Sequence, residues 1–126
     1  MNEDFTQIVT QAHSLEPGLE DRLHCLEQIG GAEVGRRYLI GAGGVSLGRA
    51  PPADIVLGDS EVSRLHCRLS LAGDALIVAD QNSTNGTYVD GVRVEAPVLL
   101  GDGAVIQVGP HRLRYERRRR EEAAAA

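Results

Sequence analysis

The sequence contains no lysine, no tryptophan and very few aromatic residues. All 13 basic residues are arginines, and aromatic residues make up 3% of the 126 residues. Without lysine, the chain cannot supply the lysine of a P-loop, of a Schiff base or of a kinase-type site. Because aromatic residues are scarce, Val, Leu, Ile and Ala must fill the core. The remaining basic chemistry is that of the guanidinium group, which holds phosphate through two parallel hydrogen bonds.

Cysteines and long apolar runs are equally scarce. Cys25 and Cys67 form no Cys-x-x-Cys motif and are too few for a disulfide framework, which is typical of reduced thiols. No apolar run is long enough for a transmembrane helix, and the acidic N-terminus does not resemble a signal peptide. A net charge of −5 argues against nucleic-acid binding. We therefore expect a cytoplasmic protein with no nucleic-acid or membrane partner.

Short apolar runs separated by glycine-rich turns dominate the middle of the chain. Fifteen glycines and a clear period of two in Leu65–Leu71 favour an all-β sandwich. Ten or eleven short strands are expected, at positions 37–40, 45–47, 55–57, 65–71, 75–79, 87–89, 92–94, 98–100, 104–108 and 111–115. We expect the glycines at 41–44 to form a hairpin turn, and Asp90-Gly91 a second, tight one.

The two ends of the chain differ from this middle part. Phe5, Ile8, Val9 and Ala12 have helical spacing, and so does a second set, Leu19, Leu23, Leu26 and Ile29. The sequence thus predicts one or two short amphipathic helices in an N-terminal segment, 1–33. Their apolar faces pack on the domain, on each other, on a second copy in a homodimer, or on another domain. The predicted β-domain covers residues 34–117, and residues 118–126 form a charged, alanine-rich tail or linker.

Four motifs fall at strand ends in this predicted sandwich. They are Gly48-Arg49, Ser63-Arg64-Leu65-His66, the loop Ser83-Thr84-Asn85-Gly86 with the following Thr87, and the later turns at 90–91 and 100–103. Each motif is weak evidence alone, since an arginine, a serine or an Asn-Gly pair is common at a surface turn. Their order in an all-β chain is the informative feature.

With these motifs, residues 34–117 resemble the forkhead-associated (FHA) domain family. The resemblance implies an eleven-stranded FHA-type sandwich (SMAD/FHA-like) whose loops bind phosphothreonine peptides. It implies that Arg49 and Ser63 contact the phosphate, that Arg64 lies at the rim, and that Thr84 and Asn85 contact the phosphothreonine and hold the peptide main chain. His66 is then a brace between loops, with Gly48, Ser83 and Gly86 as further structural support.

Elementary chemistry agrees with these roles. A phosphothreonine carries a charge of about −1.5 to −2 and three acceptor oxygens. A fixed guanidinium with converging hydroxyl and amide donors is a suitable receptor for it. The asparagine amide can both donate and accept, so Asn85 can hold a peptide bond from both sides. The extra charge of Arg64 predicts tolerance of acidic residues beside the phosphothreonine.

The sequence thus predicts a bacterial, non-enzymatic phosphothreonine-binding module without cofactor or metal, which acts with a Ser/Thr protein kinase. Ser63 and His66 lack an acid to complete a catalytic triad, and neither His-Cys pair has a metal-binding geometry. The alternative is a phosphate-independent interaction or dimerisation module, or a regulatory N-terminal domain of a larger protein such as a cyclase or secretion component. A further hypothesis makes Thr6 or Thr10 a kinase substrate that docks onto the domain's own site.

Overall fold

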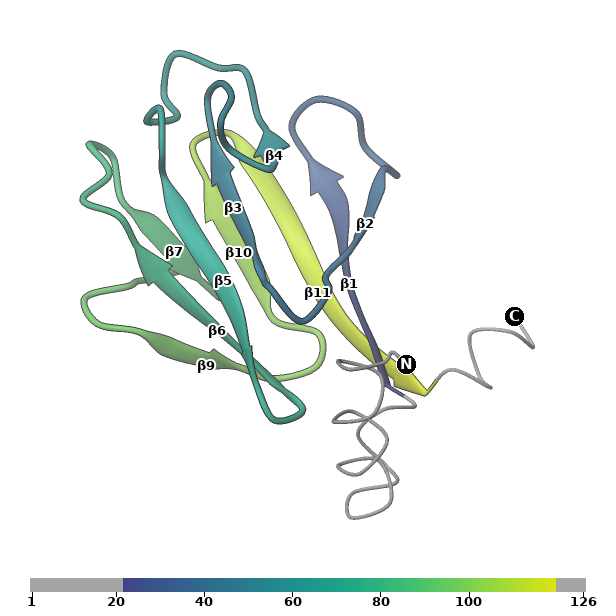
Figure 1. Ribbon diagram of the computed structural model, residues 1–126. Helices are drawn as coiled ribbons and strands as arrows, with labels where there is room; N and C mark the ends of the chain where they lie inside the picture. The colour runs from purple at the N-terminus through teal and green to yellow at the C-terminus, as the bar shows by residue number, and fades with distance from the viewer. Residues whose placement is uncertain (1–21, 120–126) are drawn as a thin grey trace.

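The computed structural model describes residues 22–119, which form eleven strands and no helix. Two sheets lie face to face, and the predicted sandwich is confirmed (Figure 1). The six-stranded sheet has the order β2 (Arg37–Leu39), β1 (Arg22–Gly30), β11 (His111–Arg119), β10 (Val105–Val108), β7 (Thr87–Val89), β8 (Val92–Arg93). The five-stranded sheet has the order β4 (Ile55–Val56), β3 (Val45–Gly48), β5 (Cys67–Ala72), β6 (Ala75–Asp80), β9 (Val98–Leu100).

Aliphatic side chains fill the space between the sheets, as the composition predicts. Both sheets contribute fully buried residues, among them Leu26, Leu47, Leu69, Leu76, Val78, Ile106, Leu113 and the single buried tyrosine, Tyr115. Each such leucine contributes about 1.5–3 kcal/mol of transfer free energy. The phenol of Tyr115 lies 2.7 Å from Nδ1 of the buried His24, so the polar tip of this ring is also satisfied.

The N-terminal strand β1 corrects the sequence prediction. Residues 22–30, expected as part of a second helix, pair with β11 on one side and β2 on the other. The alternating burial of His24, Leu26 and Gln28 has a period of two, whereas Leu23, Leu26 and Ile29 also fit a helical face. Pairing with the nine-residue β11 decides between them. Residues 22–30 therefore belong to the sandwich, and no helical face is available there for self-association. The helix predicted at 5–12 lies outside the described residues.

Two other predicted connections have different outcomes. The glycine-rich segment 41–44 does not close a hairpin, because β2 and β3 belong to different sheets and the segment crosses between them. Gly44 passes so close to the main chain of Leu69 that a Cβ would overlap its carbonyl oxygen. The tight turn at Asp90-Gly91 is confirmed: its φ values of 50° and 85° join β7 to β8 in an antiparallel pair.

The C-terminal strand is longer than predicted. β11 continues to Arg119, so Arg118 and Arg119, which were expected in the tail, belong to the sheet. The described part of the chain contains no helix that is long and apolar enough to cross a membrane.

Candidate functional site

Three loops gather at one end of the sandwich (Figure 1). They connect β3 to β4 (residues 49–54), β4 to β5 (57–66) and β6 to β7 (81–86). Every candidate site residue lies in one of these loops or, for Gly48, at the end of β3. The loops are joined to one another by main-chain and side-chain hydrogen bonds, so the sheets fix their relative positions.

Gly48 and the main chain of Arg49 connect the first two loops. A Cβ at Gly48 would overlap the carbonyl oxygen of Arg64, so only glycine allows this close approach. The amide of Arg49 donates to the carbonyl oxygens of Ser63 at 2.9 Å and of Arg64 at 3.2 Å. The backbone at Arg49 is thereby held against the β4–β5 loop.

The side chain of Arg49 is held by one hydrogen bond. Its Nη1 donates to the carbonyl oxygen of Val62 at 3.0 Å. Within residues 22–119, Arg49 forms no ion pair. A guanidinium has five N–H donors, so most of those of Arg49 remain for an anion from outside.

Ser63, Thr84 and Asn85 bring the other two loops together. The amide of Thr84 donates to Oγ of Ser63 at 2.9 Å, which leaves the hydroxyl proton of Ser63 free to be donated. The amide nitrogen Nδ2 of Asn85 donates to the carbonyl oxygen of Glu61 at 3.0 Å. Thr84 and Asn85 are exposed, and Ser63 is half-buried beside them. Side-chain donors and acceptors from two loops are therefore presented on one surface.

His66 is completely buried beneath these residues. Its Nδ1 accepts a hydrogen bond from the amide of Ser63 at 3.0 Å. The ring proton is therefore on Nε2, which donates to the carbonyl oxygen of Gly86 at 2.9 Å. The main chain of His66 adds bonds to Leu47 and Gln81. One imidazole thus connects the β4–β5 loop to the β6–β7 loop without reaching the surface.

Asp80, at the end of β6, organises the β6–β7 loop and was missed by sequence reasoning. Its Oδ1 accepts bonds from the hydroxyls of Ser83 at 2.6 Å and Thr87 at 2.7 Å, and its Oδ2 accepts one from the amide of Ser83 at 3.1 Å. Oγ of Ser83 in turn accepts a bond from the amide of Gly86. An aspartate that ends a strand three residues before a serine is a turn signal that could have identified it.

The charge of Asp80 is stabilised by this arrangement. Burial alone would raise the pKa of Asp80, but the hydrogen bonds from Ser83 and Thr87 outweigh burial and lower it. Gly86 has a φ of 90°, and a Cβ there would lie 2.9 Å from Nε of Arg93. The loop conformation therefore depends on an ionised carboxylate and a glycine.

Arg64 completes the set of candidate residues. Its carbonyl oxygen accepts from the amide of Arg49, and its exposed side chain makes no hydrogen bond or ion pair with residues 22–119. The structure thus brings Arg49, Ser63, Arg64, Thr84 and Asn85 to one end of the sandwich, above Gly48, His66, Ser83 and Gly86.

Comparison with known proteins identifies the class. The family model for the FHA domain matches residues 45–109, about half of the chain, and the chain belongs to this family. The matched segment contains all of the candidate site residues. It starts after β1 and β2, so the match does not include β1, the strand that the sequence predicted as a helix.

Curated relatives include proteins of Mycolicibacterium smegmatis. The chain is 41% identical over 83 residues to the glycogen accumulation regulator GarA of Mycolicibacterium smegmatis, covering 66% of this chain and 52% of that protein. It is 40% identical over 79 residues to the FHA domain-containing protein FhaB of the same organism, covering 63% and 51%. The chain thus spans about half the length of these curated relatives.

Solved FHA structures share the fold. The FhaA FHA domain, complexed with the intracellular domain of Rv3910, has a TM-score of 0.67 at 33% identity and covers 74% of this chain and 99% of that one. Mycobacterium tuberculosis EmbR, in complex with a low-affinity phosphopeptide, has a TM-score of 0.70 at 29% identity and covers 85% and 30%.

Proposed function

We propose that this protein is a phosphothreonine-dependent peptide-binding module that docks partners phosphorylated by a Ser/Thr protein kinase. The observation that carries the proposal is the position of Arg49. Its guanidinium is anchored by a single bond to Val62 and has no carboxylate partner within residues 22–119, although the chain as a whole is acidic. A cation fixed in this way at a loop surface is suited to a phosphate from outside.

The surrounding groups support a peptide ligand. Ser63 offers a hydroxyl proton beside Thr84, and the exposed amide of Asn85 can hold a peptide main chain. We assign phosphate binding to Arg49 and Ser63, rim contacts to Arg64, and peptide contacts to Thr84 and Asn85. His66, Ser83, Gly48 and Gly86 act through the loops that they shape. These roles describe binding and include no catalytic step, cofactor or metal.

The similar proteins support the same ligand class. One solved FHA domain at 33% identity, with a TM-score of 0.68, was studied for phosphothreonine-dependent interactions, and EmbR was solved with a phosphopeptide. GarA is described as a regulator, and an oxoglutarate dehydrogenase inhibitor of Corynebacterium jeikeium is 40% identical over 83 residues. We infer that this chain likewise acts by binding other proteins in bacterial signalling.

The test is a binding screen with paired peptide arrays. One array carries phosphothreonine peptides, and the other carries the same sequences with threonine. We expect wild-type protein to bind members of the phosphorylated array alone, and Arg49→Ala to lose that binding. Arg118→Ala is the matched control, because Arg118 lies far from the three loops. The end of β11 near these loops is His111, whose partner Val108 pairs with Thr87 beside the β6–β7 loop, and Arg118 lies toward the other end of the strand. Equal binding to both arrays would contradict the proposal.

A second candidate is a phosphate-independent interaction domain of a larger assembly. The cytoplasmic domain of the secretion protein PscD from P. aeruginosa shares the fold, with a TM-score of 0.64 at 25% identity, and covers 73% of this chain and 78% of that one. A domain of this kind would contact its partner through a surface outside the three loops. Binding that survives both dephosphorylation and Arg49→Ala would favour it. The hypothesis on Thr6 and Thr10 concerns residues outside the described part and stays a prediction.

A further inference from the structure

A hollow of about 400 Å³ lies beside the proposed phosphate-binding residues, on the outer side of the five-stranded sheet. It is lined by Ser46, Pro52, Ala53, Arg64, Leu65 and Arg68, and we call it the Arg68 subsite. Ser46 and Arg68 are register partners on β3 and β5, and the neighbouring Leu47 and Leu69 face the core. The Arg68 subsite is therefore outside the sandwich core.

The subsite adjoins the end of β3 that carries Arg49. A Cβ built at Gly48 would lie 3.1 Å from Cβ of Ala53 and would overlap the carbonyl oxygen of Arg64. Both Ala53 and Arg64 are thus packed directly on the residue before Arg49. Because extended peptide residues are spaced about 3.3 Å apart, a peptide held at Arg49 can place a nearby side chain in this hollow.

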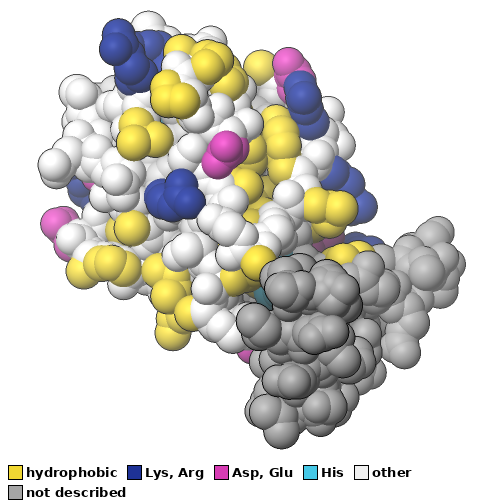
Figure 2. Space-filling model, in the orientation of Figure 1, with side chains coloured by type: hydrophobic (Ala, Val, Ile, Leu, Met, Phe, Trp, Pro, Cys, Tyr) yellow, Lys and Arg dark blue, Asp and Glu magenta, His cyan; other side chains and the backbone are white. Residues whose placement is uncertain are grey.

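The walls of the subsite combine apolar surface with positive charge. Pro52, Ala53 and Leu65 supply the apolar part, and Leu65 is 46% exposed. Figure 2 shows hydrophobic side chains beside a basic one at the upper end of the molecule, the end where the β3–β4 loop lies in Figure 1. An exposed leucine next to arginines is suited to a ligand side chain that is apolar along its stem and charged at its tip.

The two arginines of the subsite have no acidic partner. Nη2 of Arg68 donates to the carbonyl oxygen of Gly43 at 3.0 Å. The side chain of Arg64 makes no hydrogen bond, and neither arginine forms an ion pair within residues 22–119. The carboxylate closest in sequence to the hollow, Asp54, is bonded to the lining residue Ser46 and forms no ion pair with Arg64 or Arg68. Its Oδ2 accepts hydrogen bonds from the amide of Ser46 at 2.9 Å and from its hydroxyl at 3.3 Å. The positive charge of the subsite is therefore not neutralised by ion pairing.

We propose that the Arg68 subsite binds a glutamate side chain of the phosphothreonine peptide, close in sequence to the phosphothreonine. The two methylenes of glutamate pack on Pro52, Ala53 and Leu65, and its carboxylate meets the guanidinium groups of Arg64 and Arg68. Aspartate is one methylene shorter, and glutamine has the same shape without charge. This inference rests on the proposed phosphothreonine binding and adds a second recognition element to it.

The experiment measures affinities of phosphothreonine peptides that carry Glu, Asp or Gln at each of three positions on either side of the phosphothreonine. With wild-type protein we expect one position where Glu binds about fivefold more tightly than Gln, with Asp between them. Arg68→Gln should clearly lower the Glu/Gln ratio, with Arg64 left to account for the remainder, and leave the affinity for the Gln peptide unchanged. Arg68→Lys keeps the charge and should retain most of the ratio, and Arg118→Gln should retain all of it.

Two outcomes overturn the inference and are distinguishable from failure of the proposed function. A Glu/Gln ratio near one at every position, or a ratio that Arg68→Gln leaves intact, removes the subsite while phosphothreonine peptides still bind better than threonine peptides. Equal affinity for phosphorylated and unphosphorylated peptides removes the proposed function and the subsite together. Thermal unfolding of each variant establishes that it is folded when its ratio is measured, and we expect Arg68→Gln to be folded because Arg68 is exposed.

Discussion

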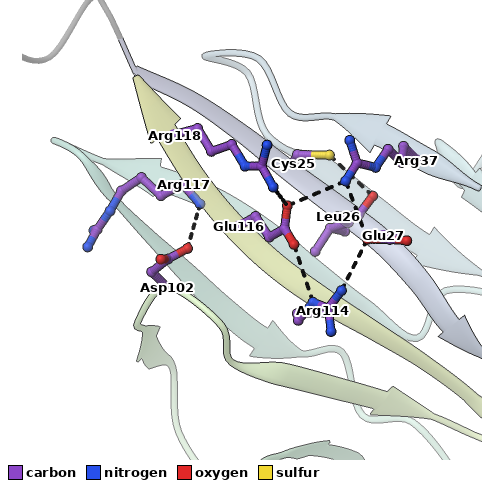
Figure 3. A network of polar contacts seen from close by, with 9 residues as sticks. All are labelled: Cys25, Leu26, Glu27, Arg37, Asp102, Arg114, Glu116, Arg117 and Arg118. Atoms are coloured by element: carbon purple, nitrogen blue, oxygen red, sulfur yellow. Dashed lines mark hydrogen bonds and ion pairs between the residues drawn. The ribbon is translucent and has the colours of Figure 1, made fainter. Parts of the chain in front are cut away.

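Arginines occur in two different settings in this protein. On the outer face of the six-stranded sheet, Glu116 lies within 3.2–3.6 Å of three of them, Arg37, Arg114 and Arg118 (Figure 3). Glu27 pairs with Arg37 at 3.5 Å and with Arg114 at 3.2 Å. At the loop end of the sandwich, by contrast, the side chain of Arg49 contacts a single carbonyl oxygen.

The difference shows what makes an arginine available for a ligand. A phosphate approaching the outer face has to compete with two carboxylates that already accept bonds from the same guanidinium groups. A phosphate approaching Arg49 meets donors without an anionic partner among residues 22–119. The content of arginine therefore does not locate an anion site. Arg49 is distinguished by the lack of an ion pair within residues 22–119 together with the donors of Ser63, Thr84 and Asn85 on the adjoining loops.

The largest effect is expected from His66→Ala, which breaks the loop end and leaves the outer face intact. The substitution leaves a cavity and unpairs the amide of Ser63 and the carbonyl of Gly86. We expect a loss of about 3 kcal/mol in the free energy of unfolding and loss of peptide binding. Urea unfolding and calorimetric titration measure these two quantities. A His66→Ala protein that binds peptide with wild-type affinity would show that the loops need no brace.

Arg49→Ala should separate binding from stability. We expect peptide binding to weaken by about 2 kcal/mol, roughly 30-fold. Stability should change little, because the Arg49 side chain is exposed and makes one hydrogen bond. Titration of a phosphothreonine peptide measures the first effect and thermal unfolding the second. Arg118→Ala removes the same charge at the outer face, and a similar loss of affinity in that variant would mean that overall charge, not position, holds the peptide.

Asp80→Asn sharpens the role of the β6–β7 loop. Weakening the bonds from Ser83 and Thr87 should cost about 1–2 kcal/mol of stability at neutral pH. Because the pKa of Asp80 is lowered in the folded protein, its contribution is present above the unfolded pKa, about 3.9, and is lost as pH falls through the lower folded pKa. Urea midpoints measured from pH 7 to pH 3 should show that wild type loses part of its advantage over Asp80→Asn below about pH 4. A difference that is constant over this range would exclude the charge as its source.

The smallest effect is expected at the outer face. Glu116→Gln removes the carboxylate shared by three arginines, but these side chains are 40–53% exposed and solvent screens them. We expect less than about 1 kcal/mol of destabilisation, decreasing further in high salt, with no change in peptide affinity. Denaturant unfolding at low and high salt provides the check. A weaker peptide affinity in Glu116→Gln would link the two arginine settings and contradict their separation.

Much of the sandwich could be predicted because its strands are bounded by strong turn signals. The alternation in β5 and the Asp90-Gly91 turn each have one physical interpretation. The strand β1 could not be predicted in this way, because Leu23, Leu26 and Ile29 suit a helical face as well as a strand. Its conformation is decided by pairing with β11, a partner about ninety residues later in the chain. The hairpin predicted at 41–44 was wrong for a related reason. A glycine-rich turn does not specify to which sheet the next strand belongs, and here the chain crosses to the other sheet.

The candidate site divides in the same way. Arg49, Ser63, Thr84 and Asn85 were recognisable from motifs at strand ends, and the structure places them on adjoining loops. Asp80 was not recognised, because the sequence shows Ser83 as a loop residue and Thr87 as the start of a strand, and only the folded chain brings both hydroxyls onto one carboxylate. The Arg68 subsite was beyond sequence reasoning for a similar reason, because Pro52 and Arg68 lie in different segments and share a hollow only in the folded chain.

The central claim, that Arg49 is held without an acidic partner so that it can receive a phosphate, is tested most directly by a double-mutant cycle. Wild type and Arg49→Ala are each titrated calorimetrically with one peptide as phosphothreonine and as threonine. We expect a coupling energy of about 2 kcal/mol between the guanidinium and the phosphate, and none when Arg118→Ala replaces Arg49→Ala. A coupling energy near zero for Arg49 would contradict the account.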